Sequence, residues 1–238
     1  MRERTETTPE QPLGERIDWS PVAAPSGEVL RGARVLLRPF DPAADAGPLH
    51  AATKDDPTLW TYLTIGPIES SEDMRRTIAA EADAEGYVFH AIEPLEAGCA
   101  LGQAAYMRID PTQGSIEIGS IWLAPRLQRT AAATEAIYLL ARHAFDDLGY
   151  RRLEWKCNAL NAPSRRAAER FGFRFEGVFR KAQIVKGHSR DTAWYSIVDD
   201  EWPAVRAAFK AWLDPANFNA VGGQKRPLAE LMASRSTG

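Results

Sequence analysis

The alternation of hydrophobic and polar positions is clearest over residues 115–123, which predicts a β-strand. Ile116, Ile118 and Trp122 are expected on one face of this strand and Glu117 on the other. A helix is expected after it, because apolar residues then recur at spacings of three and four. The apolar positions of that helix are Ala133, Ala136, Ile137, Leu140 and Ala144.

The same patterns and their turn residues predict elements along most of the remaining chain. Strands are expected over about 33–38, 87–93, 99–109, 153–157, 173–179 and 192–198. Helices are expected over about 44–54, 71–84, 163–172 and 201–212, with Ser71 as the cap of the second. Strands and helices that alternate in this way predict one mixed α/β sheet with helices packed on it.

The two ends of the chain lack this periodicity. Residues 1–29 are rich in proline and are expected to form a partly ordered N-terminal extension. Residues 216–238 are expected to form a polar C-terminal tail. The region between them, residues 30–215, is predicted to be a single domain, which agrees with a chain of 238 residues.

Composition excludes several classes of protein. A hydrophobic fraction of 45% with 26% charged residues fits a globular protein with a substantial core. The chain has no run of 18 apolar residues and its first residues are charged, so neither a membrane span nor a secretory signal is expected. Cys99 and Cys157 make neither a disulfide framework nor a zinc site, and the four histidines have no metal-ligand spacing. We therefore expect a cytoplasmic protein without a metal.

Charge is distributed unevenly along the sequence. The net charge of −3 argues against a nucleic-acid-binding protein. Residues 41–100 contain twelve carboxylates and three cations, whereas residues 151–190 contain eleven cations and three carboxylates. These segments are either two solvated faces, or an acidic half that attracts a cation and a basic half that holds a polyanion.

A turn of small residues leads from the predicted strand ending at Leu123 into the following helix. The first N–H groups of a helix have no partner within it, and the helix dipole makes this end positive. The turn therefore predicts a phosphate site, to which Arg126 and Arg129 would add charge. Many helices begin with small residues, so the turn alone is a weak signal.

Later motifs complete a pattern that resembles a known family. The residues that carry the resemblance are Glu117-Ile118-Gly119, Gln128 with Ala133, Thr134-Glu135-Ala136, Asn161 with Ser164, Gly172-Phe173 and Glu176-Gly177-Val178-Phe179-Arg180. In this order they resemble the GNAT superfamily of acyl-CoA-dependent N-acetyltransferases. Within it they are most similar to the RimJ/RimL-like branch, named for ribosomal-protein-alanine acetyltransferases. The resemblance covers about residues 35–198.

The resemblance implies the GNAT acyl-CoA N-acyltransferase fold, with a V-shaped opening between the strands predicted at 115–123 and 153–157. The pantetheine arm of acetyl-CoA, the implied co-substrate, would lie there against the backbone of Ile121, Trp122 and Leu123. The pyrophosphate would meet the N–H groups of Gln128, Arg129, Thr130, Ala131, Ala132 and Ala133, with Thr134 nearby. Asn161 would hold the pantetheine amide, and Ser164 would approach the sulfur as a candidate acid.

The chain departs from the family pattern at three positions. Arg129 and Ala131 replace glycines of the phosphate turn, and Ala168 stands where many members have a tyrosine as general acid. Arg129 would either contact a phosphate or crowd the turn. These departures leave a second hypothesis open, a non-catalytic acyl-CoA-binding or regulatory module. A nucleotide-phosphate enzyme is excluded, because the glycine spacing of its motifs is missing.

Acetyl transfer to an amine needs a base, because an alkyl amine is mostly protonated at neutral pH. Glu117 is the candidate, and the alternative is an ordinary structural ion pair. Cys157 is expected to be a small buried residue rather than a nucleophile.

The acceptor side is harder to predict from the sequence. Trp60, Tyr62 and Tyr106 would line the acceptor pocket or else belong to the core, and the acidic segment 41–100 would draw a cationic amine. His188 and Asp191 are expected in a polar turn. The acceptor would be a protein N-terminus or a small-molecule amine, and a sheet edge is compatible with a homodimer.

Overall fold

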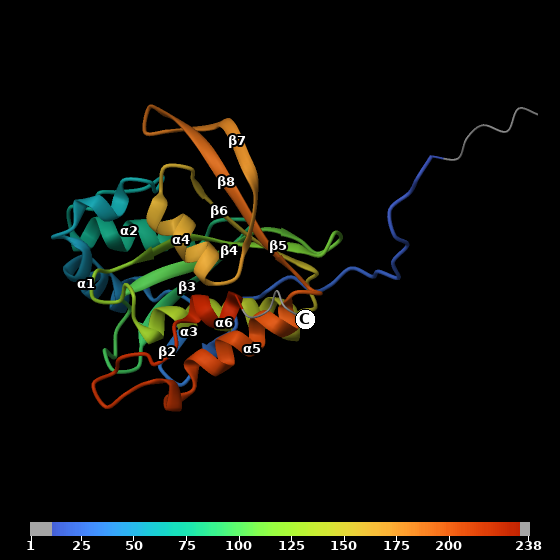
Figure 1. The fold of residues 1–238 in the computed structure, drawn as a ribbon. Coiled ribbons are helices and arrows are strands. Elements are labelled where there is room, and N and C mark those ends of the chain that lie inside the picture. Colours follow the sequence, from blue (N-terminus) through green and yellow to red (C-terminus); the bar gives the residue numbers. More distant parts are fainter. Residues whose placement is uncertain (1–10, 234–238) are drawn as a thin grey trace, which may run out of the picture.

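The computed structural model describes residues 11–233, and within them an eight-stranded mixed sheet has the order β1-β2-β3-β4-β5-β6-β8-β7 (Figure 1). The strands are β1 (Leu30–Arg31), β2 (Val35–Arg38), β3 (Tyr87–Pro94), β4 (Gly102–Asp110), β5 (Ser115–Leu123), β6 (Arg152–Asn158), β7 (Arg174–Val185) and β8 (His188–Val198). The helices are α1 (Pro42–Thr53), α2 (Ser71–Ala82), α3 (Ala131–Arg142), α4 (Ala162–Arg170), α5 (Trp202–Leu213) and α6 (Leu228–Ala233). The predicted mixed α/β sheet is thereby confirmed.

Helices cover both faces of this sheet. Figure 1 shows α3 and α5 on one side and α1 and α2 on the other. The larger core cluster joins Ile118 of β5 to Leu140 of α3 and Phe209 of α5. A smaller cluster joins Met74 of α2 to Trp122 of β5. None of the helices in the described part of the chain is long and apolar enough to cross a membrane.

The central strands β5 and β6 separate after a short parallel contact. Across these two fully described strands, pairing is confined to Ser115, Ile116 and Glu117 of β5 and the first three residues of β6. From residue 118 onward, the edge of β5 that faces β6 makes no ladder with it. The splayed pair of central strands expected from the sequence is therefore present.

A β-bulge interrupts β5 at the same level. Ala105 of β4 pairs with Gly119 and Gln103 pairs with Trp122, so two residues of β5 lie opposite one of β4. Ser120, in the bulge, has a φ of 50°. One extra residue turns the following side chains to the other face. The prediction that Trp122 shares a face with Ile116 and Ile118 is therefore wrong.

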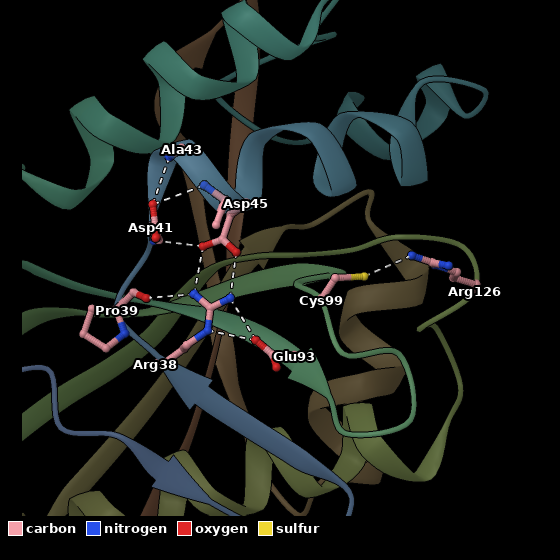
Figure 2. Close-up of polar contacts among 9 residues, drawn as sticks. Arg38, Pro39, Asp41, Ala43, Asp45, Glu93, Cys99 and Arg126 are labelled. Carbon is pink, nitrogen blue, oxygen red and sulfur yellow. Dashed lines mark hydrogen bonds and ion pairs between the residues drawn. The ribbon is translucent and has the colours of Figure 1, made fainter.

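An ion-pair network fixes α1 to the sheet. Figure 2 shows the guanidinium of Arg38, on β2, between the carboxylates of Asp45 on α1 and Glu93 on β3. The distances from Arg38 Nη2 are 2.7 Å to Asp45 Oδ1 and 2.8 Å to Glu93 Oε2. Hydrogen bonding to Asp45 is the main cause that raises the pKa of Arg38. The network holds α1 against β2 and β3.

The terminal segments are more ordered than the sequence pattern suggests. Residues 11–29 form no helix or strand, but Trp19 Nε1 donates to Thr112 O at 2.7 Å. The C-terminal segment expected as a polar tail contains α6, whose Leu228, Leu231 and Met232 are buried. Their spacing fits one face of a helix, but a run of six residues is too short for periodicity to predict one. The remainder of both terminal predictions, residues 1–10 and 234–238, lies outside the described residues.

The last two strands form a longer hairpin than expected. Nearly every residue of β7 is exposed, so it lacks the hydrophobic alternation that reveals a half-buried strand. His188 and Asp191 lie in β8 rather than in a turn, because the chain reverses at Lys186 and Gly187. A smaller correction concerns α2, which is capped by Ser70 and not by Ser71.

Candidate active site

A cavity of about 370 Å³ opens where β5 and β6 separate. Its walls come from the loop after Trp60, from the bulged part of β5, from β6, from the start of α4 and from the β7–β8 hairpin. Lys186, in the tight turn of the hairpin, donates from Nζ to the carbonyl oxygens of Trp60 and Ile65 at 2.8 and 2.9 Å. The hairpin is thereby attached to the loop across the cavity.

The free edge of β5 supplies backbone hydrogen-bonding groups to this cavity. Gly119, Ser120 and Ile121 line it, whereas Trp122 and Leu123 continue the strand toward α3. Backbone N–H and C=O groups at a strand edge accept an extended polar chain as another strand would. The carbonyl of Leu123 is contacted by Gln128, whose Nε2 donates to it at 3.0 Å.

The turn before α3 presents a second set of free donors. Thr130 caps the helix, since its Oγ1 accepts from Ala133 N at 3.1 Å. Within residues 11–233, no group accepts a hydrogen bond from the N–H of Arg129, Ala131 or Ala132. Arg129 has a φ of 63°, a left-handed conformation that glycine adopts without strain. Thr134, on the first turn, accepts from Arg170 Nη1 at 3.2 Å.

Glu135, within the Thr-Glu-Ala motif, has a structural role. Its side chain is 6% exposed, and it accepts from the backbone N–H groups of Ala33 and Arg34 at 3.0 and 2.6 Å. These bonds fix the turn between β1 and β2 against α3. The motif residue thus supports the helix that carries the free N–H groups.

Asn161 and Ser164 lie together at the start of α4 and both line the cavity. Asn161 Oδ1 accepts from Ser164 N at 3.1 Å and so caps the helix. Ser164 Oγ accepts from Trp155 Nε1 at 3.0 Å, which leaves its hydroxyl hydrogen available as a donor. Cys157 is nearby, and burial raises the pKa of its thiol although the Ser164 side chain acts in the opposite direction. A raised pKa does not favour a nucleophilic thiolate.

Glu117 lies at the apex of the opening, and its side chain is only 3% exposed. Its Oε2 is 2.7 Å from Arg108 Nη1 and 2.9 Å from Lys156 Nζ. Both ion pairs engage the same oxygen. The other oxygen, Oε1, lies beside Gly119, where an added Cβ would approach it within 3.1 Å. The predicted base is therefore at the cavity, fixed by two cations.

A second carboxylate, Glu154, shares Lys156 with Glu117. Lys156 Nζ is 2.6 Å from Glu154 Oε2, and Arg152 Nε donates to Glu154 Oε1 at 2.8 Å. Burial alone would raise the pKa of Glu154, but hydrogen bonds from Lys156 and Arg152 outweigh it and lower the pKa. Lys156 Nζ also lies 3.7 Å from the centroid of the Trp194 ring. The buried lysine is thus oriented from three sides.

Of the predicted acceptor residues, the structure brings Tyr62 to the cavity and leaves two away from it. Tyr62 lines the cavity, and its hydroxyl donates to Leu160 O at 3.2 Å. Trp60 is buried beneath the loop and packs on Trp122, with ring centroids 5.4 Å apart. Tyr106 is fully buried on the α3 side of β4, where its hydroxyl donates to Leu140 O. Trp60 and Tyr106 therefore belong to the core.

The charge of the cavity differs from the acidic pocket suggested by the sequence. Every residue of segment 41–100 is described, and none of its carboxylates lines the cavity. The charged lining residues are Glu117, Arg108, Lys156 and Arg190. Sequence analysis missed the three cations. The sequence did contain a signal for Arg190, because Arg190, Thr192 and Trp194 alternate along a strand and therefore share one face.

The described residues contain no cluster of three or more His, Cys, Asp or Glu side chains that could hold a metal ion.

Residues 34–174 match the model of the acetyltransferase (GNAT) domain family. The structure is similar to a GCN5-related N-acetyltransferase from Brucella melitensis, with a TM-score of 0.88 and 43% identity over 91% of this chain and 99% of that one. The chain is also 30% identical to the uncharacterized N-acetyltransferase YnaD of Bacillus subtilis, over 71% of this chain and 96% of the relative. It is 28% identical to the ribosomal-protein-serine acetyltransferase of Escherichia coli, over 56% and 74% of the two chains. With a matching family model over more than half its length, this chain belongs to the GNAT family of acetyltransferases.

Proposed function

We propose that the protein transfers an acetyl group from acetyl-CoA to a primary amine by direct attack of the amine. The observation that carries the proposal is the position of Glu117 at the apex of the opening between β5 and β6. A buried carboxylate and the free edge of β5 border one cavity, and β5 leads along the chain to the N-terminus of α3. Membership of the GNAT family supports the same reaction.

The donor would be held by groups that this chain leaves free. The N–H groups of Arg129, Ala131 and Ala132 suit a pyrophosphate, since they lie at the positive end of α3. The unpaired edge of β5 suits the two amides of a pantetheine arm. Asn161 lies across the opening from that edge, and its amide nitrogen can donate to a pantetheine carbonyl while Oδ1 caps α4.

The attacking nitrogen loses two protons overall, one before the attack and one as the amide forms, and the leaving thiolate gains one. Glu117 Oε1 would take the proton of the ammonium group, directly or through a water, so that the amine nitrogen can attack the thioester carbonyl. A backbone N–H of the free β5 edge would meet the oxyanion that forms. The new C–N bond then replaces the C–S bond, and the Ser164 hydroxyl would protonate or solvate the leaving thiolate. No covalent enzyme intermediate is required.

The acceptor proposed is the N-terminal amine of a protein or peptide, with a small-molecule amine as the alternative. The printed name of the Escherichia coli relative, a ribosomal-protein-serine acetyltransferase, supports the former. GNAT-fold enzymes use many acceptors, so this step rests on analogy.

Calorimetric titration of acetyl-CoA, with desulfo-CoA and ADP as controls, tests the donor site. Micromolar binding that depends on the pyrophosphate is expected, followed by acetylation in a screen of peptide and small amines. Absence of acetyl-CoA binding would contradict the proposal and favour a phosphate turn blocked by Arg129.

A further inference from the structure

Strand β8 presents three unpartnered polar atoms in or beside the cavity. Arg190, Thr192 and Trp194 alternate along the strand, and all three line the cavity. Within residues 11–233, the buried atoms Arg190 Nε, Thr192 Oγ1 and Trp194 Nε1 have no hydrogen-bond partner. The Thr192 side chain is among the buried polar groups, with the residue 6% exposed. Buried polar groups nearly always have a hydrogen-bond partner, so such a row is unusual unless a ligand completes it.

Two of these atoms are obligate donors. Guanidinium and indole nitrogens carry hydrogens and accept nothing, whereas a hydroxyl can do both. A neutral amine or another cation would therefore leave the row unsatisfied. A ligand group that offers several acceptor oxygens, such as a carboxylate or a phosphate, would satisfy it.

Among the cations that line the cavity, Arg190 is the one without a carboxylate partner in the described part of the chain. Arg108 and Lys156 are paired with Glu117, and Lys156 also with Glu154. No described carboxylate lies within ion-pair distance of the Arg190 guanidinium. Its neighbour in sequence, Asp191, accepts from Lys181 N at 2.7 Å instead.

The surroundings of Arg190 place it near the proposed reaction centre. The charged or titratable groups that influence it are Cys157, Glu117 and Arg108, all lining the same cavity. Burial lowers the pKa of Arg190, and guanidinium groups nevertheless stay protonated near neutral pH. The three carboxylates Glu117, Glu154 and Glu176 balance the three cations paired with them, Arg108, Lys156 and Arg152, so the charge of Arg190 remains uncompensated.

We infer that the amine acceptor carries an anionic group, a carboxylate or a phosphate, which Arg190 binds with Thr192 and Trp194 beside it while the amine faces Glu117. This inference rests on the proposed function, because it names the acceptor of that same site. When its amine is neutral and ready to attack, such an acceptor carries charge only on its anionic group, which complements the unpaired guanidinium of Arg190. It replaces the cationic acceptor that the acidic segment 41–100 suggested.

The test compares amines that carry an anionic group with counterparts that lack it. β-Alanine and its amide probe a carboxylate, phosphoethanolamine and ethanolamine probe a phosphate, and peptides beginning Ser-Asp and Ser-Asn probe an acidic N-terminus. We expect kcat/KM to favour at least one acidic member tenfold or more over its neutral counterpart. The pair of amines with the largest ratio of kcat/KM values shows whether the site binds a carboxylate, a phosphate or an acidic peptide N-terminus.

Arg190→Gln should reduce that ratio to within about twofold, mainly through KM, and leave acetyl-CoA binding unchanged. Lys181→Gln is the matched control, since it removes one charge from an exposed position of the same hairpin. It should keep the ratio. Equal use of neutral and acidic amines by the wild-type protein would overturn the inference while the acetyltransferase proposal stands. Loss of acetyl-CoA affinity in Arg190→Gln would also overturn it, by assigning Arg190 to the donor.

A binding measurement decides the inference even where turnover is slow. Each amine of the panel is titrated into the wild-type and Arg190→Gln proteins in the presence of CoA. Binding of an acidic member that the substitution weakens tenfold supports the inference, and absence of such binding contradicts it. Failure of acetyl-CoA itself to bind is a separate result, which rejects the proposed function.

Discussion

Glu117 Oε2 lies 2.9 Å from Lys156 Nζ, and both side chains are nearly fully buried, at 3% and 4% exposed. The pair crosses the point where β5 and β6 separate, so the carboxylate is held at the apex of the opening. A buried ion pair contributes little net stability, because desolvation offsets the attraction. The ion pair instead fixes the position of the carboxylate, whose Oε1 lies beside Gly119 in the cavity wall.

Glu117→Gln should lower kcat by about 10²–10⁴-fold, the usual contribution of a general base. Acetyl-CoA affinity should stay near that of the wild type, because Glu117 is not among the groups proposed to hold the donor. Steady-state kinetics beside calorimetry separate the two effects. An unchanged kcat would remove Glu117 from the mechanism.

Gly119→Ala should also lower kcat with little effect on donor binding. The added Cβ would lie 2.4 Å from Met107 Sδ and 3.1 Å from Glu117 Oε1. The flexible methionine can move aside, whereas the carboxylate is fixed by its two ion pairs. Met107→Ala combined with Gly119→Ala relieves the first contact and leaves the second. If the double variant recovers full activity, crowding of Glu117 is not the cause.

Arg129→Gly should stabilise the fold and weaken donor binding. The left-handed φ of 63° costs a non-glycine residue about 1–2 kcal/mol, partly offset by the greater entropy of unfolded glycine. We expect the free energy of unfolding to rise by about 0.5–1 kcal/mol. Arg129 is exposed in the same turn as the free N–H groups, and its positive charge favours a pyrophosphate there, so acetyl-CoA affinity should fall when it is removed. Tighter binding would show instead that Arg129 crowds the turn.

Asn161 combines two roles that different substitutions separate. Asn161→Ala should lose the cap to Ser164 N and lower the free energy of unfolding by about 0.5–2 kcal/mol. The same variant should bind acetyl-CoA more weakly by about 1–2 kcal/mol. Asn161→Asp keeps the cap but cannot donate to a carbonyl, so it should keep stability and still lose affinity. Equal affinity of Asn161→Asp and wild type would leave Asn161 with the capping role alone.

Glu81 of α2 is linked through Gln103 to the bulge of β5. Gln103 Nε2 donates to Glu81 Oε1 at 3.0 Å and to Ser120 O at 3.2 Å. Burial raises the pKa of Glu81 to about 7 from a usual value of 4.5. The folded protein therefore holds the proton more tightly than the unfolded chain, and this stabilisation is lost as pH rises from about 4.5 to 7.

Glu81→Gln should remove that pH dependence while keeping an acceptor for Gln103. We expect the variant to exceed the wild type in free energy of unfolding at pH 8, by about 1–3 kcal/mol, and to approach it at pH 4. Urea denaturation at several pH values measures the difference. A constant difference across that range would contradict an ionisation of Glu81 between pH 4.5 and 7.

The sequence by itself determined the order of elements and the motifs that carry the chemistry. The alternation over 115–123 and the spacing on α3 predicted strands and helices of a mixed α/β sheet, because local periodicity reports which side of an element is buried. The GNAT fold was expected from the resemblance that motifs such as Asn161 with Ser164 carry. The alternation also placed Glu117 opposite the apolar face of its strand.

The tertiary structure decided which residues meet in the cavity. Periodicity does not show a bulge, so the sequence could not reveal that Trp122 turns to the other face after Ser120. Tyr106 looked like a pocket residue although its face of β4 is covered by α3. Glu117, Lys156 and Arg190 are far apart in sequence, and only the strand order β5-β6-β8 brings them to one cavity. Contacts between distant strands depend on sheet order and register, which no local pattern contains.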